Sequence, residues 1–291
     1  MSRAVIQNQF LRAEAETQGA QLLSIRASDG TEYLWQGDPA YWSGRAPNLF
    51  PYVARLTDGK YYLDGRLYHM EIHGLAPYLE FALKEADPDR MVFELSSSEK
   101  TLAAYPRAFV FRVTYKLRNR CLSVTYEVEN RDERTMYFGL GAHPGFNVPL
   151  SGGTFEDYRL RFDSPCDPIR VDFTEECFLS GREVRCPLRD CCFLELRHEL
   201  FDHDAVVLKE AGRRVTLEGP DSHCVTVEFP GMEYLGLWHK PGTDAPYVCI
   251  EPWCSLPSTQ GKVAVLEEQT DLIALPVGKT YRNIWRIKIR A

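Results

Sequence analysis

Residues 109–117 read Phe-Val-Phe-Arg-Val-Thr-Tyr-Lys-Leu, and residues 122–128 read Leu-Ser-Val-Thr-Tyr-Glu-Val. In both stretches every second residue is large and apolar, and most of the residues between them are polar. This alternation is typical of a β-strand that buries one face. The short Arg118-Asn119-Arg120 connection predicts that the two strands form a hairpin.

The same alternation returns at four further places along the chain. These are residues 158–162, 215–217, 225–229 and 284–289. Turn sequences such as Asp-Gly and Gly-Pro-Asp separate the strand-sized segments, and helical periodicity is confined to short stretches at 101–104 and 195–201. Many short strands at regular spacing indicate an all-β fold, a large antiparallel β-sandwich or barrel. Because no linker or internal repeat is visible, we expect residues 1–291 to form a single domain.

Composition and charge exclude several classes of protein. Apolar residues make up 44% of the 291 residues and charged residues 26%, which allows a sizeable core and excludes a disordered chain. The 34 basic and 41 acidic residues are interspersed and give a net charge of −7, which argues against nucleic acid or an anionic membrane as a partner. No apolar run approaches the roughly 20 residues that span a bilayer, and no secretory segment follows Met1. We therefore expect a cytoplasmic protein.

The cysteines favour reduced thiols over a disulfide framework. There are nine of them, an odd number, and no Cys-x-x-Cys pair occurs. In a chain without an export segment, this pattern predicts buried free thiols. We expect no structural metal.

Two motifs resemble known sites but lack the spacing that those sites require. Residues 139–145 are similar to a dinucleotide fingerprint, but Pro144 stands where a helix should begin and no βαβ unit surrounds it. His198 and His203 are similar to a zinc-protease pair. Five residues turn a helix by about 500°, however, so the two imidazoles would not share a face. We expect neither a nucleotide site nor a metalloprotease.

Three segments place ionisable side chains at the ends of apolar strands, beside residues that break regular pairing. They are residues 47–55 with 72–77, residues 139–149 and residues 247–258. The candidates in them are Arg55, His73, His143 and Glu251. A neutral imidazole and a carboxylate form the natural acid–base pair near pH 7. Nearby aromatic side chains suit the apolar face of a sugar ring. These are Phe50, Tyr52, Phe146, Trp238 and Trp253.

The order of several motifs carries a resemblance to a known family. The motifs are Asp29-Gly-Thr-Glu-Tyr-Leu-Trp35, Leu49-Phe-Pro with Arg55, Ile72-His73-Gly74, Gly141-Ala-His143-Pro144, Glu251-Pro-Trp253 and Val277-Gly-Lys279. In these motifs, which cover almost the whole chain, the sequence resembles the aldose 1-epimerase (galactose mutarotase-like) family, nearest its LacX-type branch. The resemblance implies a large antiparallel β-sandwich, a supersandwich, with an open sugar cleft. It implies neither a metal nor an organic cofactor.

The resemblance also implies a role for each candidate residue. Glu251 matches the general base that takes the proton from the hydroxyl at C1 of the sugar. His143 matches the general acid that gives a proton to the ring oxygen. His73 and Arg55 match residues that hydrogen-bond the ring oxygen and the neighbouring hydroxyls.

The family has a further aspartate that binds sugar hydroxyls, and this residue matches Asp204. Asp202, two residues earlier in the sequence, is the alternative. Two positions depart from the LacX-type pattern. Pro77 stands where that pattern usually has an arginine, which removes any sugar or phosphate contact of the arginine. Ala54 stands where it usually has a glycine, which adds a methyl group near the cleft.

Mutarotation moves one proton off O1 and one proton onto O5, so one base and one acid suffice. In this assignment Glu251 must be ionised and His143 protonated, which predicts a bell-shaped pH profile. We therefore expect an aldose 1-epimerase that acts on a hexose. Its partner is a small sugar, and the protein is a monomer or a weak homodimer.

Three alternatives remain. A hexose-6-phosphate 1-epimerase would need cations at the C6 end of the cleft, for which Arg45 and Lys240 are candidates, although the net charge of −7 disfavours a phosphorylated substrate. A second alternative is a non-catalytic carbohydrate-binding protein of the same fold. Such a protein would not need to retain the set His73, His143 and Glu251, so the intact set favours an enzyme. A glycoside hydrolase needs two carboxylates about 5–9.5 Å apart, and a single carboxylate here lies in a motif-like context.

Overall fold

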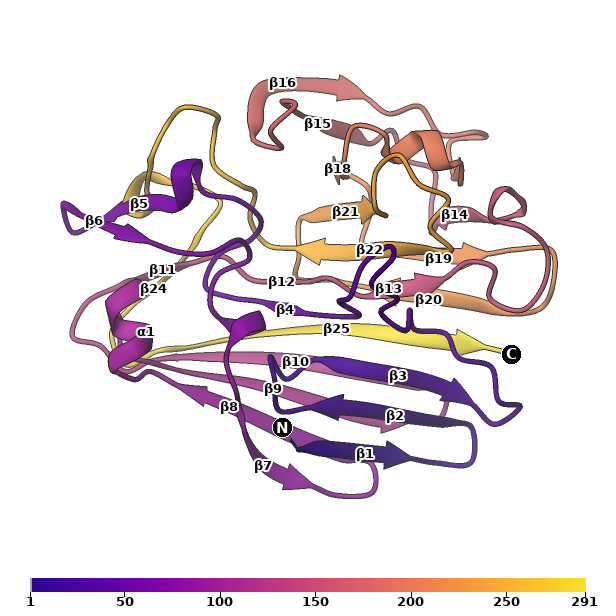
Figure 1. The fold of residues 1–291 in the computed structure, drawn as a ribbon, viewed down its shortest axis with the longest axis horizontal. Coiled ribbons are helices and arrows are strands. Elements are labelled where there is room, and N and C mark those ends of the chain that lie inside the picture. Colours follow the sequence, from indigo (N-terminus) through magenta and orange to yellow (C-terminus); the bar gives the residue numbers. More distant parts are fainter. Residues whose placement is uncertain (1) are drawn as a thin grey trace.

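The computed structural model describes residues 2–291, and strands dominate it (Figure 1). The expected hairpin is confirmed. Strands β9 (Phe109–Arg118) and β10 (Cys121–Asn130) pair antiparallel, with Leu117 opposite Leu122. Along β9 every second side chain from Phe109 onward is buried, so this face of the hairpin forms part of the core.

The hairpin belongs to a sheet of nine strands, with β25 at its centre. In spatial order the strands are β17 (Phe193–Glu195), β14 (Arg159–Phe162), β19 (Arg214–Glu218), β20 (Cys224–Glu228), β25 (Thr280–Arg290), β10, β9, β8 (Arg90–Ser96) and β7 (Ala82–Ala86). Neighbouring strands pair antiparallel throughout this sheet. Four of these strands contain the further stretches of alternation, so those predictions are confirmed.

A second large sheet carries the cleft described below. Its order is β16 (Leu179–Arg185), β15 (Ile169–Phe173), β18 (Val206–Lys209), β21 (Tyr234–Trp238), β22 (Tyr247–Trp253), β12 (Gly141–Ala142) and β4 (Asn48–Leu49), and β13 (Gly145–Asn147) also pairs with β22. In Figure 1 strands β21 and β22 lie above β25.

Smaller elements complete the fold. The strands are β1 (Arg3–Gln7), β2 (Leu11–Glu16), β3 (Leu22–Ala27), β5 (Lys60–Leu63), β6 (Arg66–His69), β11 (Met136–Phe138), β23 (Ala264–Val265) and β24 (Ile273–Leu275). The helical elements are α1 (Glu99–Ala104) and the 3-10 turns Thr57–Gly59, Ala76–Tyr78, Phe155–Asp157, His198–Phe201 and Leu266–Glu268. The helical stretch expected at 101–104 is therefore present, whereas of residues 195–201 only His198–Phe201 forms a turn and Glu195 ends β17.

A buried polar network ties the second sheet to the nine-stranded sheet. The hydroxyl of Tyr126 on β10 donates to Asn48 Oδ1 over 2.7 Å, and the hydroxyl of Tyr115 on β9 donates to the carbonyl of Ala20 over 2.7 Å. The amide of Asn48 in turn donates to the carbonyls of Gly19 and Ala20. Buried polar groups must find partners, so this network fixes β4 above the hairpin.

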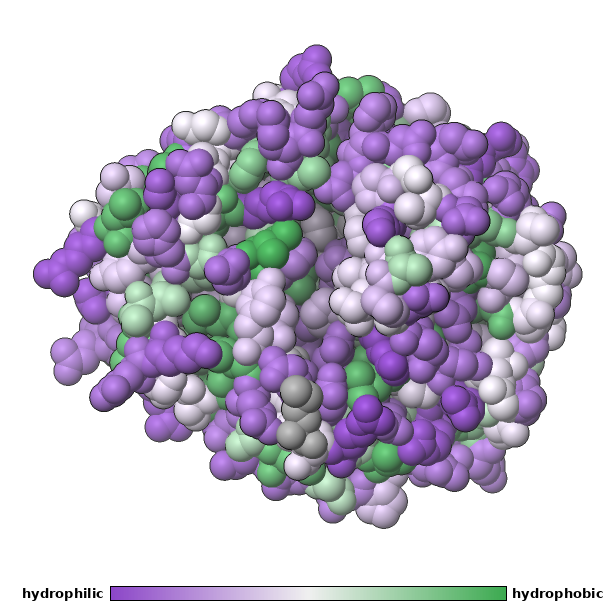
Figure 2. All heavy atoms as spheres, in the orientation of Figure 1, coloured by the Kyte–Doolittle hydropathy of each residue, from purple (hydrophilic) through white to green (hydrophobic). Residues whose placement is uncertain are grey.

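The expectation of an all-β, antiparallel architecture is confirmed. Its single-domain organisation stays a prediction. The face seen in Figure 2 is largely hydrophilic, with hydrophobic residues scattered over it. Among residues 2–291, none of the helices has the length and apolar character needed to cross a bilayer.

Candidate active site

A cleft of about 560 Å³ opens along the second sheet. This volume lies within the range of about 300–1,000 Å³ that is usual for small-molecule sites. Six of the residues that the sequence assigns to catalysis or sugar binding line it. They are Arg55, His73, His143, Asp204, Trp238 and Glu251. The structure therefore brings together side chains from segments almost 200 residues apart.

Glu251 reaches the cleft from β22, whose seven residues are all buried. In the register of β21 and β22 it lies opposite Gly236. A Cβ atom at Gly236 would come within 3.2 Å of Glu251 Cβ and within 3.1 Å of the Trp253 ring. A larger residue there would therefore crowd the acidic side chain and the indole ring.

His143 lies in the short connection between β12 and β13. Its backbone N–H donates to the carbonyl of Pro47 over 3.1 Å, and the carbonyl of Pro144 accepts from the N–H of Ile250 over 3.1 Å. The imidazole stacks on the ring of Trp42 with centroids 4.9 Å apart. Backbone bonds on both sides and an aromatic ring above therefore hold the imidazole in one orientation.

The imidazole and the carboxylate meet in the cleft. His143 Nε2 lies 3.3 Å from Glu251 Oε2, and the two residues are 8% and 1% exposed. Burial raises the pKa of Glu251 well above its usual value, and the charge of Asp204 adds to this effect, whereas Trp253 opposes it. Burial also lowers the pKa of His143 well below its usual value, and His73 adds to that effect.

Both shifts have the same physical cause, because burial disfavours the charged form of each group. Both directions oppose the expectation of an ionised Glu251 beside a protonated His143. They favour a neutral pair, in which the carboxyl group keeps its proton and the imidazole keeps a single N–H. The charged form contains the same number of protons, and one transfer across 3.3 Å converts one form into the other.

His73 enters the cleft from a left-handed backbone conformation with φ of 66°. The next residue, Gly74, has φ of 83°, and a Cβ atom there would lie 2.4 Å from the carbonyl oxygen of Phe50. The N–H of Ala54 donates to His73 Nδ1 over 3.2 Å, which leaves the ring proton on Nε2. Burial and the charge of Arg55 lower the pKa of His73 to about 4. The ring is therefore a neutral N–H donor at pH 7.

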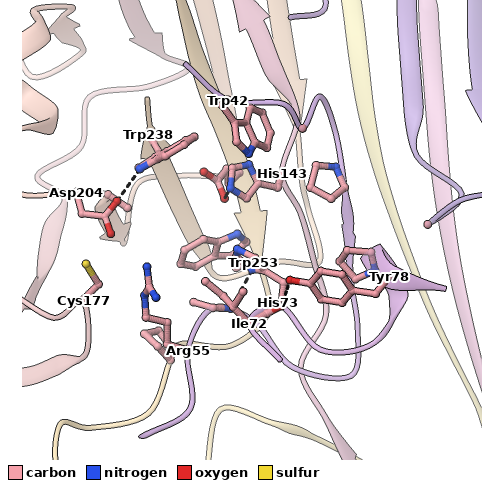
Figure 3. Close-up of a pocket in the computed structure, with 18 of the residues that line it drawn as sticks. Trp42, Arg55, Ile72, His73, Tyr78, His143, Cys177, Asp204, Trp238 and Trp253 are labelled. Atoms are coloured by element: carbon pink, nitrogen blue, oxygen red, sulfur yellow. Dashed lines mark hydrogen bonds and ion pairs between the residues drawn. The ribbon is translucent and has the colours of Figure 1, made fainter. Parts of the chain in front are cut away.

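Asp204 lies on the other side of the cleft, where Figure 3 shows it beside Trp238, with Cys177 and Arg55 below it. The indole N–H of Trp238 donates to Asp204 Oδ1 over 2.6 Å. Asp202 is exposed and lies outside the lining of the cleft. Of the two alternatives left open by the sequence, the structure therefore places Asp204 in the cleft.

The aromatic residues proposed for the sugar face divide into two groups. Trp238 and Trp253 line the cleft. Phe50, Tyr52 and Phe146 do not, because they are fully buried in the main core, so their assignment to a sugar face is wrong. An aromatic residue type shows that a side chain will pack, but it does not show whether it packs in the core or in the cleft.

Trp42 and Cys177 are among the lining residues that the sequence did not single out. Trp42 stacks on His143, and Cys177 lies beside Asp204 and Arg55. Burial, with a contribution from Asp204, raises the pKa of the Cys177 thiol to about 12, so it stays protonated at pH 7. Both residues lie in connections between strands, where alternation gives no information. In the sequence, Gly37-Asp38-Pro39 before Trp42 and Ser43-Gly44 after it indicate a loop there, but not that its tryptophan faces the cleft.

The two cations proposed for a phosphate group lie outside the lining of the cleft. Arg45 donates to the carbonyl of Leu23 over 2.9 Å, and Lys240 donates to the carbonyl of Ala40 over 3.0 Å. Pro77 does line the cleft, at the position where the LacX-type pattern has an arginine. Among the described lining residues, the permanent cation is Arg55.

Two side chains of the cleft and the buried thiol of Cys249, which does not line it, are possible donors for a metal ion. One donor atom each from His143, Cys249 and Glu251 lies within 4.8 Å of the others. All three residues are buried.

Comparison with known proteins identifies the family. The model of the family described as "Aldose 1-epimerase" matches residues 2–287. The chromosomal protein LacX of Lactococcus lactis subsp. lactis is 34% identical over a 298-residue alignment, which covers 96% of this chain and 97% of LacX.

Solved structures match this chain over its full length. A galactose mutarotase related enzyme from Lactobacillus acidophilus has a TM-score of 0.94 at 29% identity, with 100% of this chain and 98% of that chain covered. A galactose mutarotase-like protein from Lactobacillus casei has a TM-score of 0.92 at 29% identity, with 99% and 100% covered. The fold is therefore galactose mutarotase-like, and the chain belongs to the aldose 1-epimerase family.

Proposed function

We propose that this protein interconverts the α and β anomers of an unphosphorylated hexose, as an aldose 1-epimerase. One observation carries the proposal: a buried imidazole and a buried carboxyl group lie 3.3 Å apart in a cleft of sugar-binding size. The pair can move the two protons that the reaction requires. Membership of the aldose 1-epimerase family supports the same activity.

In the proposed reaction, the carboxyl proton first passes from Glu251 to His143. The carboxylate of Glu251 then takes the proton from O1, and the electrons of that O–H bond form the C1=O double bond. The bond between C1 and O5 breaks, and O5 takes its proton from His143. The free aldehyde rotates about C1–C2, and O5 attacks the other face of C1 while the two residues exchange roles.

Other cleft residues support these steps. The Nε2–H of His73 is positioned to donate to a sugar oxygen, because Nδ1 is occupied by the backbone of Ala54. Arg55 and Asp204 provide a donor and an acceptor for hydroxyl groups. The indole rings of Trp238 and Trp253 provide apolar surfaces for the ring carbons.

The charges in the cleft favour an unphosphorylated sugar. A phosphate group is best bound by several cations. Arg45 and Lys240 are engaged with backbone carbonyls elsewhere, and Pro77 replaces an arginine of the LacX-type pattern. The acidic side chain of Asp204 would also repel a phosphate group.

The test is anomer exchange by NMR on the purified protein. Saturation of the α-anomeric proton is transferred to the β-anomer when the enzyme exchanges them, and galactose, glucose and glucose 6-phosphate are compared in turn. Glu251→Gln should lower the rate by about 10²–10⁴-fold, the usual contribution of a positioned acid or base. Glu218→Gln is the matched control, because Glu218 lies on β19 and its partners are Arg159 and Arg161.

Each outcome has a clear meaning. Fast exchange of galactose or glucose that is lost in Glu251→Gln alone supports the proposal. A rate for Glu251→Gln equal to that of the wild type would exclude Glu251 as the base. Exchange confined to glucose 6-phosphate would show a hexose-6-phosphate 1-epimerase. Line broadening of the sugars without exchange would show a binding protein.

A further inference from the structure

Cys249 is a buried thiol that the proposed reaction does not use. It lies two residues before Glu251 on β22, so the two side chains share one face of the strand. Its side chain packs in a small cluster with Trp35 and Tyr247, against Trp42. Trp42 also stacks on His143. The thiol is thus held directly behind the acid–base pair.

The distances suit a metal ion. Donor atoms of His143, Cys249 and Glu251 all lie within 4.8 Å of one another. Zinc bonds of about 2.0–2.2 Å to nitrogen and oxygen place two such ligands about 3.4 Å apart on a tetrahedral centre. The observed 3.3 Å between His143 Nε2 and Glu251 Oε2 agrees with that separation. A thiolate bond of about 2.3 Å would place the sulfur about 3.6 Å from the other two ligands, so the sulfur needs to approach them by at most about 1.2 Å.

Unpartnered atoms in the same place point to a ligand. Within residues 2–291, His143 Nδ1 and Glu251 Oε2 are buried and have no hydrogen-bond partner. Buried polar atoms without a partner are uncommon and call for an explanation. A cation bound to His143 Nε2 and Glu251 Oε2 would give the carboxylate oxygen its partner, whereas Nδ1, on the opposite edge of the ring, would not gain one from the same ion.

The chemistry of the donor set selects the ion. Nitrogen, sulfur and oxygen ligands together suit Zn²⁺, whereas Mg²⁺ and Ca²⁺ prefer oxygen ligands alone. Binding would displace one proton from the thiol and one from the carboxyl group. The two negative ligands then balance the two charges of the ion, so the buried site stays neutral. Three protein ligands leave a fourth position for water on the side of the cleft.

We propose that His143, Cys249 and Glu251 form a binding site for Zn²⁺, and that the ion inhibits the enzyme. The site itself is independent of the proposed function. The inhibition rests on the proposed function, because the ion occupies the imidazole and the carboxylate that must transfer protons.

The test measures metal binding directly. Co²⁺ replaces Zn²⁺ in such sites and gives a thiolate-to-metal absorption band, and calorimetry gives the affinity for Zn²⁺ itself. Cys249→Ala should abolish the absorption band and weaken zinc binding at least about tenfold, because even a partner outside the ligand shell is worth that much. Cys224→Ala is the matched control, a buried thiol on β20 of the other sheet. It should leave both readouts unchanged.

Two further measurements separate the possible failures. Galactose should weaken the Co²⁺ band, because sugar and metal compete for the cleft, and this readout needs no variant. Anomer exchange is measured with and without zinc for each protein, so that each variant is normalised to itself. A band that persists in Cys249→Ala, or is absent in the wild type, would overturn the site. A band without inhibition of a protein that exchanges anomers would overturn the inhibitory role alone.

Discussion

The β9–β10 hairpin and the strands around Glu251 use the same antiparallel pairing for opposite purposes. In the hairpin, ten residues on each strand pair without interruption, and side chains alternate between the core and the surface. Around Glu251, β12 has two residues and β13 has three, and Pro144 lies between them. Continuous pairing builds a stable core, whereas interrupted pairing leaves a side chain free to face the cleft.

Two glutamates show what this difference does to a charge. Glu218 lies on β19, and burial acts to raise its pKa, but hydrogen bonds from Arg161 and Arg159 outweigh burial and lower it. Glu251 lies on β22, where burial and the charge of Asp204 raise its pKa well above the usual value. Glu218, on the nine-stranded sheet, is therefore held as an anion that is paired with two arginines. The environment of Glu251 on the second sheet favours the protonated carboxyl group, which is the group that the proposed reaction uses.

The largest change in stability should come from breaking the bend that holds His73. In Gly74→Ala, the new methyl group would meet the carbonyl oxygen of Phe50 at 2.4 Å, at φ of 83°. We expect a loss of at least about 2–3 kcal/mol in the free energy of unfolding, because clash and backbone strain add. Urea denaturation measures the loss, and the rate of anomer exchange per folded molecule should fall as well.

Gly65→Ala is the matched control for that substitution. Gly65 has a similar φ of 69°, but the added methyl group would have no described neighbour within 4 Å beyond the adjoining residues. The free energy of unfolding of Gly65→Ala should fall by about 1 kcal/mol, which is the cost of the backbone conformation alone. Equal losses in the two variants would show that the close approach to Phe50 contributes nothing.

The next effect concerns the pH dependence of stability. The pKa of His73 is about 4 in the folded protein and about 6.5 in the unfolded chain. Between these values the unfolded chain binds a proton that the folded protein excludes. The contribution of His73 is therefore fully present above pH 6.5 and is lost as the pH falls towards 4.

At pH 5 the loss should reach about 1–2 kcal/mol relative to pH 7, and His73→Asn should remove it. Unfolding by urea at both pH values measures the difference. His69→Asn, at an exposed position on β6, serves as the control. Its free energy of unfolding should change with pH as that of the wild type does. A slope that is the same in His73→Asn and the wild type would contradict the assignment.

The smallest effect should come from the link between the two sheets. Tyr126→Phe removes the hydroxyl that donates to Asn48 Oδ1. We expect a loss of about 1 kcal/mol in the free energy of unfolding, the usual net contribution of one hydrogen bond, with the rate per folded molecule unchanged. Tyr62→Phe on β5 is the exposed control. A lower rate per folded molecule would show that the link also positions His143.

The contrast between the two regions explains what could be predicted from the sequence. Alternation reveals a strand that buries one face, so the hairpin at 109–128 and the strand at 284–289 could be placed. Interruptions are visible as well, because proline follows both His143 and Glu251. Several residues that line the cleft could therefore be selected by their position at the ends of strands.

Other parts of the cleft depend on contacts between distant segments. Asp204 and Asp202 have similar sequence contexts, and what distinguishes them is the N–H of Trp238, more than 30 residues away. Trp42 covers His143 from a loop that has no periodicity. The protonation of Glu251 and His143 follows from burial, which depends on how the whole sheet packs. No local pattern contains that information.

The position of β25 has a consequence for the synthesis of the protein. Residues 280–290 lie between β10 and β20 and supply the pairing that joins one half of the nine-stranded sheet to the other. On the ribosome, the hairpin of β9 and β10 can form long before that strand exists, because its contacts are local. The sheet cannot close until residue 290 has been made. Until then the nascent chain exposes two unpaired strand edges, and chaperones that cover such edges should be needed most in this interval.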